Sequence, residues 1–390
     1  MFLPTMFEIP LTTTTLDEEE VEAAVRVLRS KWLTMGEEVA AFEGEFAVAM
    51  GSRHAVAVSN GTTALEIAYE VAGFGPDDEV ILPSITFVAC LNGLRRLGVV
   101  AVLADVASED DLTINVQDVA RKITPRTRGI VSMPHAGFCP AMAELEALAH
   151  DRGLVLIEDA CHAPLAELDG RKIGTFGRAA TWSFFGNKNM TTGEGGMITT
   201  DDEDFAARCR LIRSHGITRT TWDRARGHSH DYDVACVGTN ARMDEIRAAI
   251  GRVQLRKLPG ATQDRARVAG VIRRLMEDAR IPGLGVPYSR SRGTSAHHLF
   301  CVLLPVGADR RAVMTAMKEV GVQTSIHYPP LHRFGSTAPY FQTTGRAVNL
   351  PVTEAVEARI LTLPLGPAMS EAECGRVVEA LAEGLRNRVR

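Results

Sequence analysis

The chain has 390 residues, of which 45% are hydrophobic and 23% are charged, the composition of a globular protein that buries a large core. Its net charge of −5 argues against bulk affinity for nucleic acid or anionic membranes. No apolar run approaches the roughly 20 residues of a membrane-spanning helix, and the first residues show no signal-peptide pattern. The seven cysteines are scattered without a C-x-x-C pair, so we expect reduced thiols in a cytoplasmic protein and no metal site.

Apolar strands alternate with helices in the first half of the chain, after a helix at 16–30. Seven strands are predicted, at 54–59, 79–82, 99–105, 128–133, 154–158, 179–184 and 196–200. Helices are predicted between them, at 61–71, 87–97, 115–122 and 141–152. This rhythm predicts an α/β fold with a mainly parallel sheet covered by helices on both faces. Ligands of such sheets bind at the carboxyl ends of the strands.

The second half of the chain starts with two long predicted helices, at 203–215 and 241–258. Pro259-Gly260 is expected to break the helical pattern. A second set of elements follows, with helices near 263–279, 308–320 and 370–386 and a strand near 297–304. We therefore predict a large domain over 1–259, which includes the N-terminal segment, and a smaller α/β domain over 260–390. Between the two long helices, 216–238 is rich in His, Arg, Asp and Gly, and long irregular segments of this kind are often functional.

Lys188 lies between an apolar strand that ends in Ser183 and a glycine-rich turn at 193–196. Upstream, the apolar strand 154–158 is followed by Asp159, which must find a cation or hydrogen-bond donors because burying an unpaired carboxylate is costly. A lysine that forms a Schiff base and an acid that holds a pyridinium nitrogen are the protein's half of pyridoxal phosphate (PLP) chemistry. The sequence therefore indicates PLP as the cofactor.

Other residues supply the remaining features of a PLP site, each with a structural alternative. The segment 60–63 follows a strand and opens a helix, whose amides and dipole favour an anion, although it is equally a helix cap. Ser183 either donates to a phosphate or bonds to the backbone. Phe87 either stacks on a pyridine ring or packs in the core. His162 either contacts the ring oxygen or caps a turn.

Together these segments resemble the DegT/DnrJ/EryC1/StrS family of PLP-dependent sugar aminotransferases, which have the aspartate aminotransferase fold, fold type I. The resemblance covers nearly the whole chain. It is most specific at Glu158-Asp159-Ala160 and in the segment around Lys188. Further matching segments are Lys31–Gly36, Asn60–Thr62, Pro83–Phe87, Gly238–Met243, His327–His332 and Leu361–Leu365.

The resemblance implies roles for individual residues. Lys188 is the Schiff-base lysine and Asp159 the partner of the pyridinium nitrogen. The other cofactor contacts that it implies are the phosphate ligands Gly61, Thr62 and Ser183, the stacking ring of Phe87 and the ring-hydroxyl contact of His162. It also implies homodimers with shared active sites, in which Asn240 reaches the phosphate of the neighbouring subunit.

Substrate contacts are expected from three places. The resemblance places His327 and Tyr328 near a sugar nucleotide, with Thr34 and Met35 as further contacts. Arg224 and Arg226 of the irregular segment suit a diphosphate, because guanidinium groups form bidentate hydrogen bonds with phosphate oxygens.

The chain departs from the family pattern at three places. His162 stands where many relatives have glutamine, and Thr239 stands where an aromatic residue is common. The segment Met133–Gly137 is tighter than the usual P-V-H-x-x-G. Family dehydratases carry histidine in place of the lysine, so Lys188 favours transamination.

We therefore expect transfer of an amino group from L-glutamate to a keto carbon of a nucleoside-diphosphate keto-deoxyhexose, with a 4-keto sugar favoured over a 3-keto one. A cyclic polyol ketone or a related carbocycle is an alternative acceptor. A non-catalytic PLP-binding regulator is a second alternative, but such regulators usually carry a DNA-binding domain, for which the chain has no spare segment.

Overall fold

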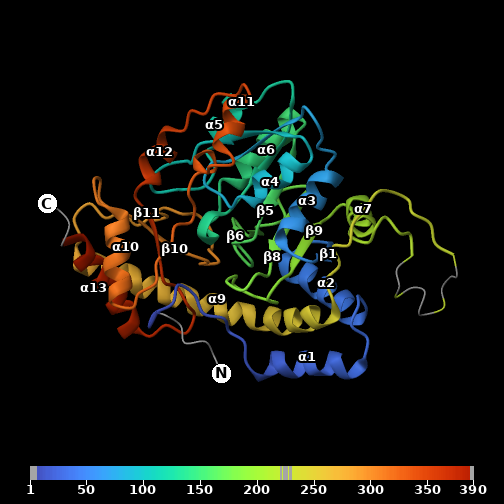
Figure 1. Cartoon of the computed structure of the whole chain (residues 1–390), viewed down its shortest axis with the longest axis horizontal. Coiled ribbons are helices and arrows are strands. Elements are labelled where there is room, and N and C mark those ends of the chain that lie inside the picture. The colour runs from blue at the N-terminus through green and yellow to red at the C-terminus, as the bar shows by residue number, and fades with distance from the viewer. Residues whose placement is uncertain (1–6, 220–221, 223–226, 228–230, 387–390) are drawn as a thin grey trace.

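The structure, a computed structural model, describes residues 7–219, 222, 227 and 231–386. Its centre is a seven-stranded sheet with the strand order β1-β9-β8-β5-β4-β2-β3 (Figure 1). The strands are β1 (His54–Val58), β2 (Glu79–Pro83), β3 (Val100–Ala104), β4 (Thr127–Ser132), β5 (Val155–Asp159), β8 (Ala179–Ser183) and β9 (Gly196–Thr200). Neighbouring strands from β8 to β3 pair in parallel, and β9 pairs antiparallel with both β1 and β8. The predicted mainly parallel sheet is confirmed.

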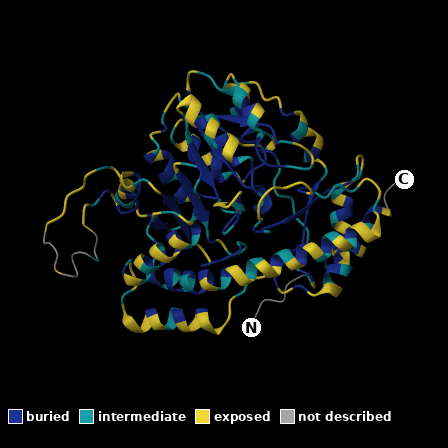
Figure 2. Ribbon diagram, turned by 180° about the vertical axis from the view of Figure 1, so that it is seen from behind, coloured by how far each residue is buried: buried dark blue, intermediate teal, exposed yellow. Residues whose placement is uncertain are grey.

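Both faces of this sheet are covered by helices, because successive side chains of a strand point to opposite faces and both sets are apolar. Val80 and Leu82 of β2 belong to one buried cluster, whereas Ile81 between them belongs to the other. Helices α3, α4 and α7 cover the first face, and α2, α5, α6 and α9 cover the second. Figure 2 shows the strands as a dark-blue, buried layer. The bounds are α1 (Glu18–Ser30), α2 (Glu37–Met50), α3 (Gly61–Val71), α4 (Ala89–Arg96), α5 (Val116–Lys122), α6 (Met142–Arg152) and α7 (Glu203–Arg213).

The C-terminal part of the chain builds a separate buried cluster around the antiparallel pair β10 and β11. Ile9 joins this cluster and forms a bridge with Val322, so the N-terminal segment also packs here. The elements of this part are α9 (Glu245–Ala279), β10 (Phe300–Leu303), α10 (Arg310–Glu319), η2 (Leu331–Arg333), α11 (Ala338–Thr343), α12 (Pro351–Glu357), β11 (Ile360–Leu363) and α13 (Glu371–Arg386). Three short elements precede it, namely η1 (His135–Gly137), β6 (Glu167–Leu168) and β7 (Arg171–Lys172).

The expected helix break at Pro259-Gly260 is wrong. Helix α9 continues through both residues, with Pro259 inside it. Both residues lie on the exposed side of the helix, while Leu258 before them and Val268 after them are buried in different clusters. Packing on both sides of Pro259-Gly260 therefore outweighs the helix-breaking tendency of these two residues, since packing supplies most helical stability in proteins. The division into domains at this point stays a prediction.

The loop between α1 and α2 is held by Glu245, the first residue of α9. Its carboxylate is 4% exposed and accepts the backbone N–H groups of Gly36, Glu38 and Val39 at 2.8–2.9 Å. Its own backbone N–H donates to the carbonyl of Leu33 at 3.1 Å. These contacts satisfy the first amides of α2, which have no acceptor within their own helix, and fix the loop at 31–36.

Throughout the described ranges, no helix has both the length and the apolar character needed to cross a bilayer. All seven cysteines are free.

Replacing Glu245 with alanine is expected to lower the free energy of unfolding by about 3 kcal/mol, because two buried backbone donors and one partly buried donor lose their acceptor. Chemical denaturation of both proteins measures the difference. Glu277→Ala, an exposed position on the same helix, is the matched control and should stay within about 0.5 kcal/mol of the parent. A Glu245→Ala protein as stable as this control would contradict the assigned role.

Candidate active site

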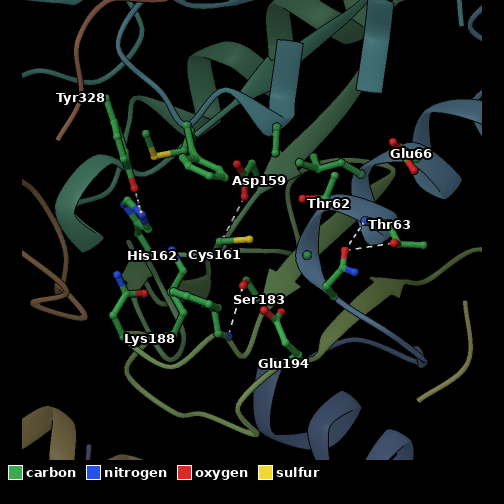
Figure 3. A pocket seen from close by; sticks show the side chains of 18 of the residues that line it. Thr62, Thr63, Glu66, Asp159, Cys161, His162, Ser183, Lys188, Glu194 and Tyr328 are labelled. Carbon is green, nitrogen blue, oxygen red and sulfur yellow. Dashed lines mark hydrogen bonds between the residues drawn. The ribbon is translucent and has the colours of Figure 1, made fainter. Parts of the chain in front are cut away.

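A cavity of about 660 Å³ lies at the carboxyl ends of β1, β5 and β8, where ligands of parallel sheets bind (Figure 3). Seven of the residues predicted to contact cofactor line it together with both predicted substrate residues of the segment 327–332. They are Gly61, Thr62, Phe87, Asp159, His162, Ser183, Lys188, His327 and Tyr328. The structure therefore brings together residues from five segments that are far apart in the sequence.

The first turn of α3 forms one wall of the cavity and has the features of an anion cradle. Asn60 caps the helix by accepting the backbone N–H of Thr63 at 2.8 Å. The amides of Gly61 and Thr62 precede that capped position and line the cavity, where helix geometry leaves them without an acceptor in their own helix. A Cβ on Gly61 would lie 2.7 Å from the Cβ of Ser183. Glycine is therefore required for α3 to approach β8 so closely.

Asp159 ends β5 and is 4% exposed. Its Oδ2 accepts a hydrogen bond from the thiol of Cys90 at 2.9 Å, and its Oδ1 accepts the backbone N–H of Cys161 at 3.3 Å. Among the described residues, no ion pair is formed by this carboxylate. A buried carboxylate with only two donors, one of them a weak thiol, has acceptor capacity left for a strong N–H donor in the cavity.

Lys188 lies in the turn that follows β8, and its side chain enters the same cavity. Burial lowers the pKa of its amine, with Cys161 and Asp159 acting in the opposite direction. A lowered pKa increases the fraction of neutral, nucleophilic amine, which is the form that attacks a carbonyl carbon.

His162 faces Lys188 from the segment after β5. Its Nε2 is hydrogen bonded to the hydroxyl of Tyr328 at 3.0 Å, whereas its Nδ1 is buried and has no partner. Burial and the nearby Lys188 lower the pKa of this imidazole well below its usual value, so the ring is neutral. Burial raises the pKa of the Tyr328 phenol in the same way. The unpartnered Nδ1 is a vacant hydrogen-bonding position beside the amine.

Three more histidines surround the site, and all are uncharged. Burial lowers the pKa of His135 and of His327 to about 4, and it lowers that of His298 strongly. His135 donates through Nε2 to the carbonyl of His327 at 2.7 Å and thereby supports the peptide that carries Tyr328. The described residues contain no cluster of His, Cys, Asp or Glu that could hold a metal ion.

Residues 14–382 match the DegT/DnrJ/EryC1/StrS aminotransferase family. The chain belongs to this family. It is 35% identical over 391 residues to the spore coat polysaccharide biosynthesis protein SpsC of Bacillus subtilis, an alignment that covers 98% of this chain and 97% of that protein.

Solved structures agree with this family assignment. The aminotransferase TlmJ of Streptoalloteichus hindustanus is similar with a TM-score of 0.89 and 31% identity, over 98% of this chain and all 100% of that chain. PseC of Helicobacter pylori, an aminotransferase involved in the biosynthesis of pseudaminic acid, has a TM-score of 0.89 and 26% identity, over 97% and 100% of the two chains. Together, the family match and the structural matches confirm the predicted fold type I, the PLP cofactor and the class of enzyme, a sugar aminotransferase.

The residues of the cavity fit PLP. The first turn of α3 suits its phosphate, and the under-satisfied carboxylate of Asp159 suits its ring N–H. The amine of Lys188, whose pKa burial lowers, suits its aldehyde, and the unpartnered Nδ1 of His162 suits its ring oxygen. Phe87 is 51% exposed at the wall, where its ring offers a face to the cofactor.

Some predicted residues do not line the cavity of their own chain. Thr34, Met35 and Asn240 are absent from its described lining. Thr34 and Asn240 are exposed, and Met35 packs partly against the core. Arg224 and Arg226 lie outside the described residues. The segment that contains them leaves the body next to α7 (Figure 1), and its Trp222 packs edge-on against Trp32 with ring centroids 5.1 Å apart.

The sequence did not reveal several residues that the site contains. Cys90 and Cys161 both donate hydrogen bonds to Asp159. His298 is hydrogen bonded to Asn189, the neighbour of Lys188, at 2.8 Å. Of these, Cys161 had a local signal, since it follows the acid by two positions, whereas Cys90 contacts Asp159 across 69 positions of the chain. The role of His298 had none, because its contact crosses 109 positions of the chain. Other lining residues not foreseen are Glu66, Arg96, Met133, Phe185, Asn187 and Glu194.

Gly61→Ala is expected to weaken binding of PLP by roughly tenfold or more, because the added methyl group forces α3 away from Ser183 and costs about 1–3 kcal/mol. Fluorescence titration of the apoprotein with PLP measures the dissociation constant. Gly186→Ala is the matched control, since this cavity-side turn has open space around the glycine. Equal affinities for the two variants would show that the close approach is unimportant.

Proposed function

We propose that this enzyme transfers the amino group of L-glutamate to a keto carbon of a nucleoside-diphosphate keto-deoxyhexose, with a 4-keto sugar as the favoured acceptor. The observation that carries the proposal is the meeting of Lys188, Asp159 and the anion cradle of α3 in one cavity. The relatives named for polysaccharide and pseudaminic acid biosynthesis support a sugar as acceptor. The cavity also extends beyond the cofactor residues to Glu66 and Arg96, which leaves room for a second ligand.

Bound PLP supplies an electron sink beside the α-carbon of the amino donor, which no side chain provides. The role of the protein is to bind and orient this cofactor. Gly61, Thr62 and Ser183 bind the phosphate, and Phe87 holds the ring from one face. Asp159 holds the proton on the ring nitrogen, and a carboxylate fixed there in a dry site stabilises that charge better than water would.

Lys188 has two tasks in this proposal. Its amine, whose pKa burial lowers, would hold the cofactor at its aldehyde and so fix the ring in the cavity. With the amino donor in the site, Nζ would take up the proton from the α-carbon of the donor as a general base. The lowered pKa of this amine supports both tasks, because each requires the uncharged form.

His162 and Tyr328 form the wall opposite the cradle. With Tyr328 as donor to Nε2, the Nδ1 of His162 carries the proton and donates to the ring oxygen of the cofactor. Many relatives have glutamine at position 162, and its side-chain amide also offers an N–H donor. Histidine at this position therefore preserves the hydrogen bond to the ring oxygen. His327 then presents a neutral imidazole to the sugar, and the Tyr328 oxygen, whose proton is donated to His162, can accept a hydrogen bond from it.

We also propose a homodimer with shared active sites. Asn240, Thr34 and the described residues of the segment 216–238 do not line the cavity of their own chain, although Asn240 and Thr34 were predicted to contact cofactor or substrate. Two aromatic rings at the cavity, Phe87 and Phe185, are 51% and 48% exposed. A second copy that brings its Asn240 to this opening would cover both rings and add a donor to the phosphate cradle.

The function is tested by mixing the PLP form of the enzyme with glutamate and a panel of keto sugars, with mass detection of the aminated product. We expect the long-wavelength absorbance of the lysine-bound cofactor to fade with glutamate and to return with a nucleoside-diphosphate 4-keto sugar. Lys188→Ala should abolish turnover while the protein stays folded by circular dichroism. Amination of an unphosphorylated cyclic ketone, without binding of any sugar nucleotide, would establish the carbocycle reading instead.

The arginines of the segment 216–238 give a second check of the acceptor. Replacing Arg224 and Arg226 with alanine should raise KM for the sugar nucleotide more than KM for glutamate, because the diphosphate loses charged donors. Equal changes in both constants would argue against a diphosphate contact.

The shared site is tested with hybrid dimers. Lys188→Ala chains mixed with Asn240→Ala chains should recover activity above that of either parent, because one site of each hybrid combines an intact lysine with an intact asparagine. If each site takes both residues from one chain, no hybrid contains an intact site. Native mass spectrometry of differently tagged chains shows that hybrids have formed. Hybrids without recovered activity would refute the sharing.

A further inference from the structure

The carboxylate of Asp159 sits at the end of a buried hydrogen-bonded chain. The thiol of Cys90, on the first turn of α4, lies 2.9 Å from Oδ2, and the hydroxyl of Thr86 lies 3.4 Å from the sulfur. Cys90 and Thr86 are 0% exposed. Neither residue is required by the mechanism described above, and neither belongs to the residues that contact cofactor.

The direction of this chain follows from the groups themselves. An ionised carboxylate only accepts hydrogen bonds, so the thiol of Cys90 must donate to Asp159. The sulfur is then left as an acceptor, and the hydroxyl of Thr86 donates to it. Burial and the neighbouring Asp159 raise the pKa of the Cys90 thiol well above its usual value, so the donor keeps its proton.

The contact matters because Asp159 has little else to hold it. Its other oxygen accepts only the longer bond from the amide of Cys161 at 3.3 Å. No cation among the described residues is paired with it. Without the thiol, the side chain could turn about its own Cβ and leave the direction of the cavity. A misplaced acceptor loses most of its hydrogen-bond energy, because that energy falls steeply with angle.

We propose that Cys90 is a positioning residue, whose thiol fixes the carboxylate of Asp159 so that its free lone pairs face the ring nitrogen of the cofactor. This inference rests on the proposed role of Asp159. Thr86 orients the thiol in turn, so the chain Thr86–Cys90–Asp159 links the start of α4 to the end of β5. Serine at position 90 would keep a donor of nearly the same size, whereas alanine would not.

The test compares Cys90→Ala and Cys90→Ser, each reconstituted with PLP labelled with nitrogen-15 at the ring. The nitrogen-15 chemical shift reports how far the ring nitrogen is protonated, without any turnover. We expect Cys90→Ala to move this resonance toward the unprotonated position and to lower kcat about tenfold, with a smaller change in KM. Cys90→Ser should restore most of both, because its hydroxyl replaces the lost donor.

Cys209→Ala is the matched control for packing. Cys209 is also 0% exposed and belongs to the same buried cluster as Cys90, but it lies on α7, away from the carboxylate to which Cys90 is hydrogen bonded. It should lose thermal stability to a similar extent and leave the nitrogen-15 resonance and kcat unchanged.

A second comparison places Cys90→Ala in an Asp159→Asn background, where it should lower kcat no further, because the two residues act as one unit. The inference is overturned if Cys90→Ala leaves the resonance and kcat at their original values, or if Cys90→Ser fails to restore them. If Asp159→Asn alone changes neither quantity, the proposed role of Asp159 fails, and the inference about Cys90 fails with it.

Discussion

Two successive carboxylates at the end of β5 determine the geometry on which the site depends. Because neighbouring side chains of a strand leave it on opposite faces, Glu158 and Asp159 diverge. Glu158 is 1% exposed and accepts the backbone N–H groups of Gly174, Phe176 and Gly177 at 2.7–2.8 Å. It thereby fixes the turn that leads into β8, the strand that precedes Lys188. Asp159 faces the cavity instead. One strand end therefore supplies the acid and sets the path of the chain that brings the lysine opposite to it.

The turn that carries Lys188 is also held from distant parts of the chain. The backbone N–H of Thr191 donates to Gln254 of α9 at 3.2 Å, and Gln254 donates to Glu20 of α1 at 2.8 Å. On the other side, Asn189 bonds His298 and the carbonyl of Ala296, just before β10. The lysine is thus positioned by both ends of the molecule. This arrangement suits a side chain that must be placed within a fraction of an ångström to react.

Sequence patterns predicted those parts of the molecule that depend on local periodicity. The strands and most helices of the sheet domain were found because both faces of each strand are apolar, and Lys188, Asp159 and Gly61 were found because each follows a strand end. The patterns failed where packing between distant segments determines the local structure. Pro259 should have ended a helix, but burial on both sides of it carries α9 onward. Helix α2 was not predicted, since its buried Phe42 and Phe46 are intermixed with small residues that show little periodicity.

The contacts that hold the site residues in place could not be predicted from the sequence, for the same reason. Cys90 meets Asp159 across 69 positions, and Tyr328 meets His162 across 166, so nothing near either residue indicates the bond. The tight segment 133–137 was recognised as unusual from its sequence alone. Its purpose appeared only in the structure, where His135 supports the peptide that carries Tyr328.

The charge balance of the cavity bears on how a diphosphate could be bound. Four histidines surround the site, yet burial lowers the pKa of each, so none contributes a positive charge near neutral pH. Among the described lining residues, Arg96 is the only guanidinium, and it is already paired with Glu66 at 3.3 Å. Lys188 is committed to the cofactor. Two negative phosphate groups would therefore meet a described wall that has no unpaired guanidinium and also carries the carboxylates of Asp159 and Glu194, so the cations that neutralise them must come from outside it. The arginines of the segment 216–238 are the groups best suited to that task, provided that a neighbouring subunit brings them to the opening.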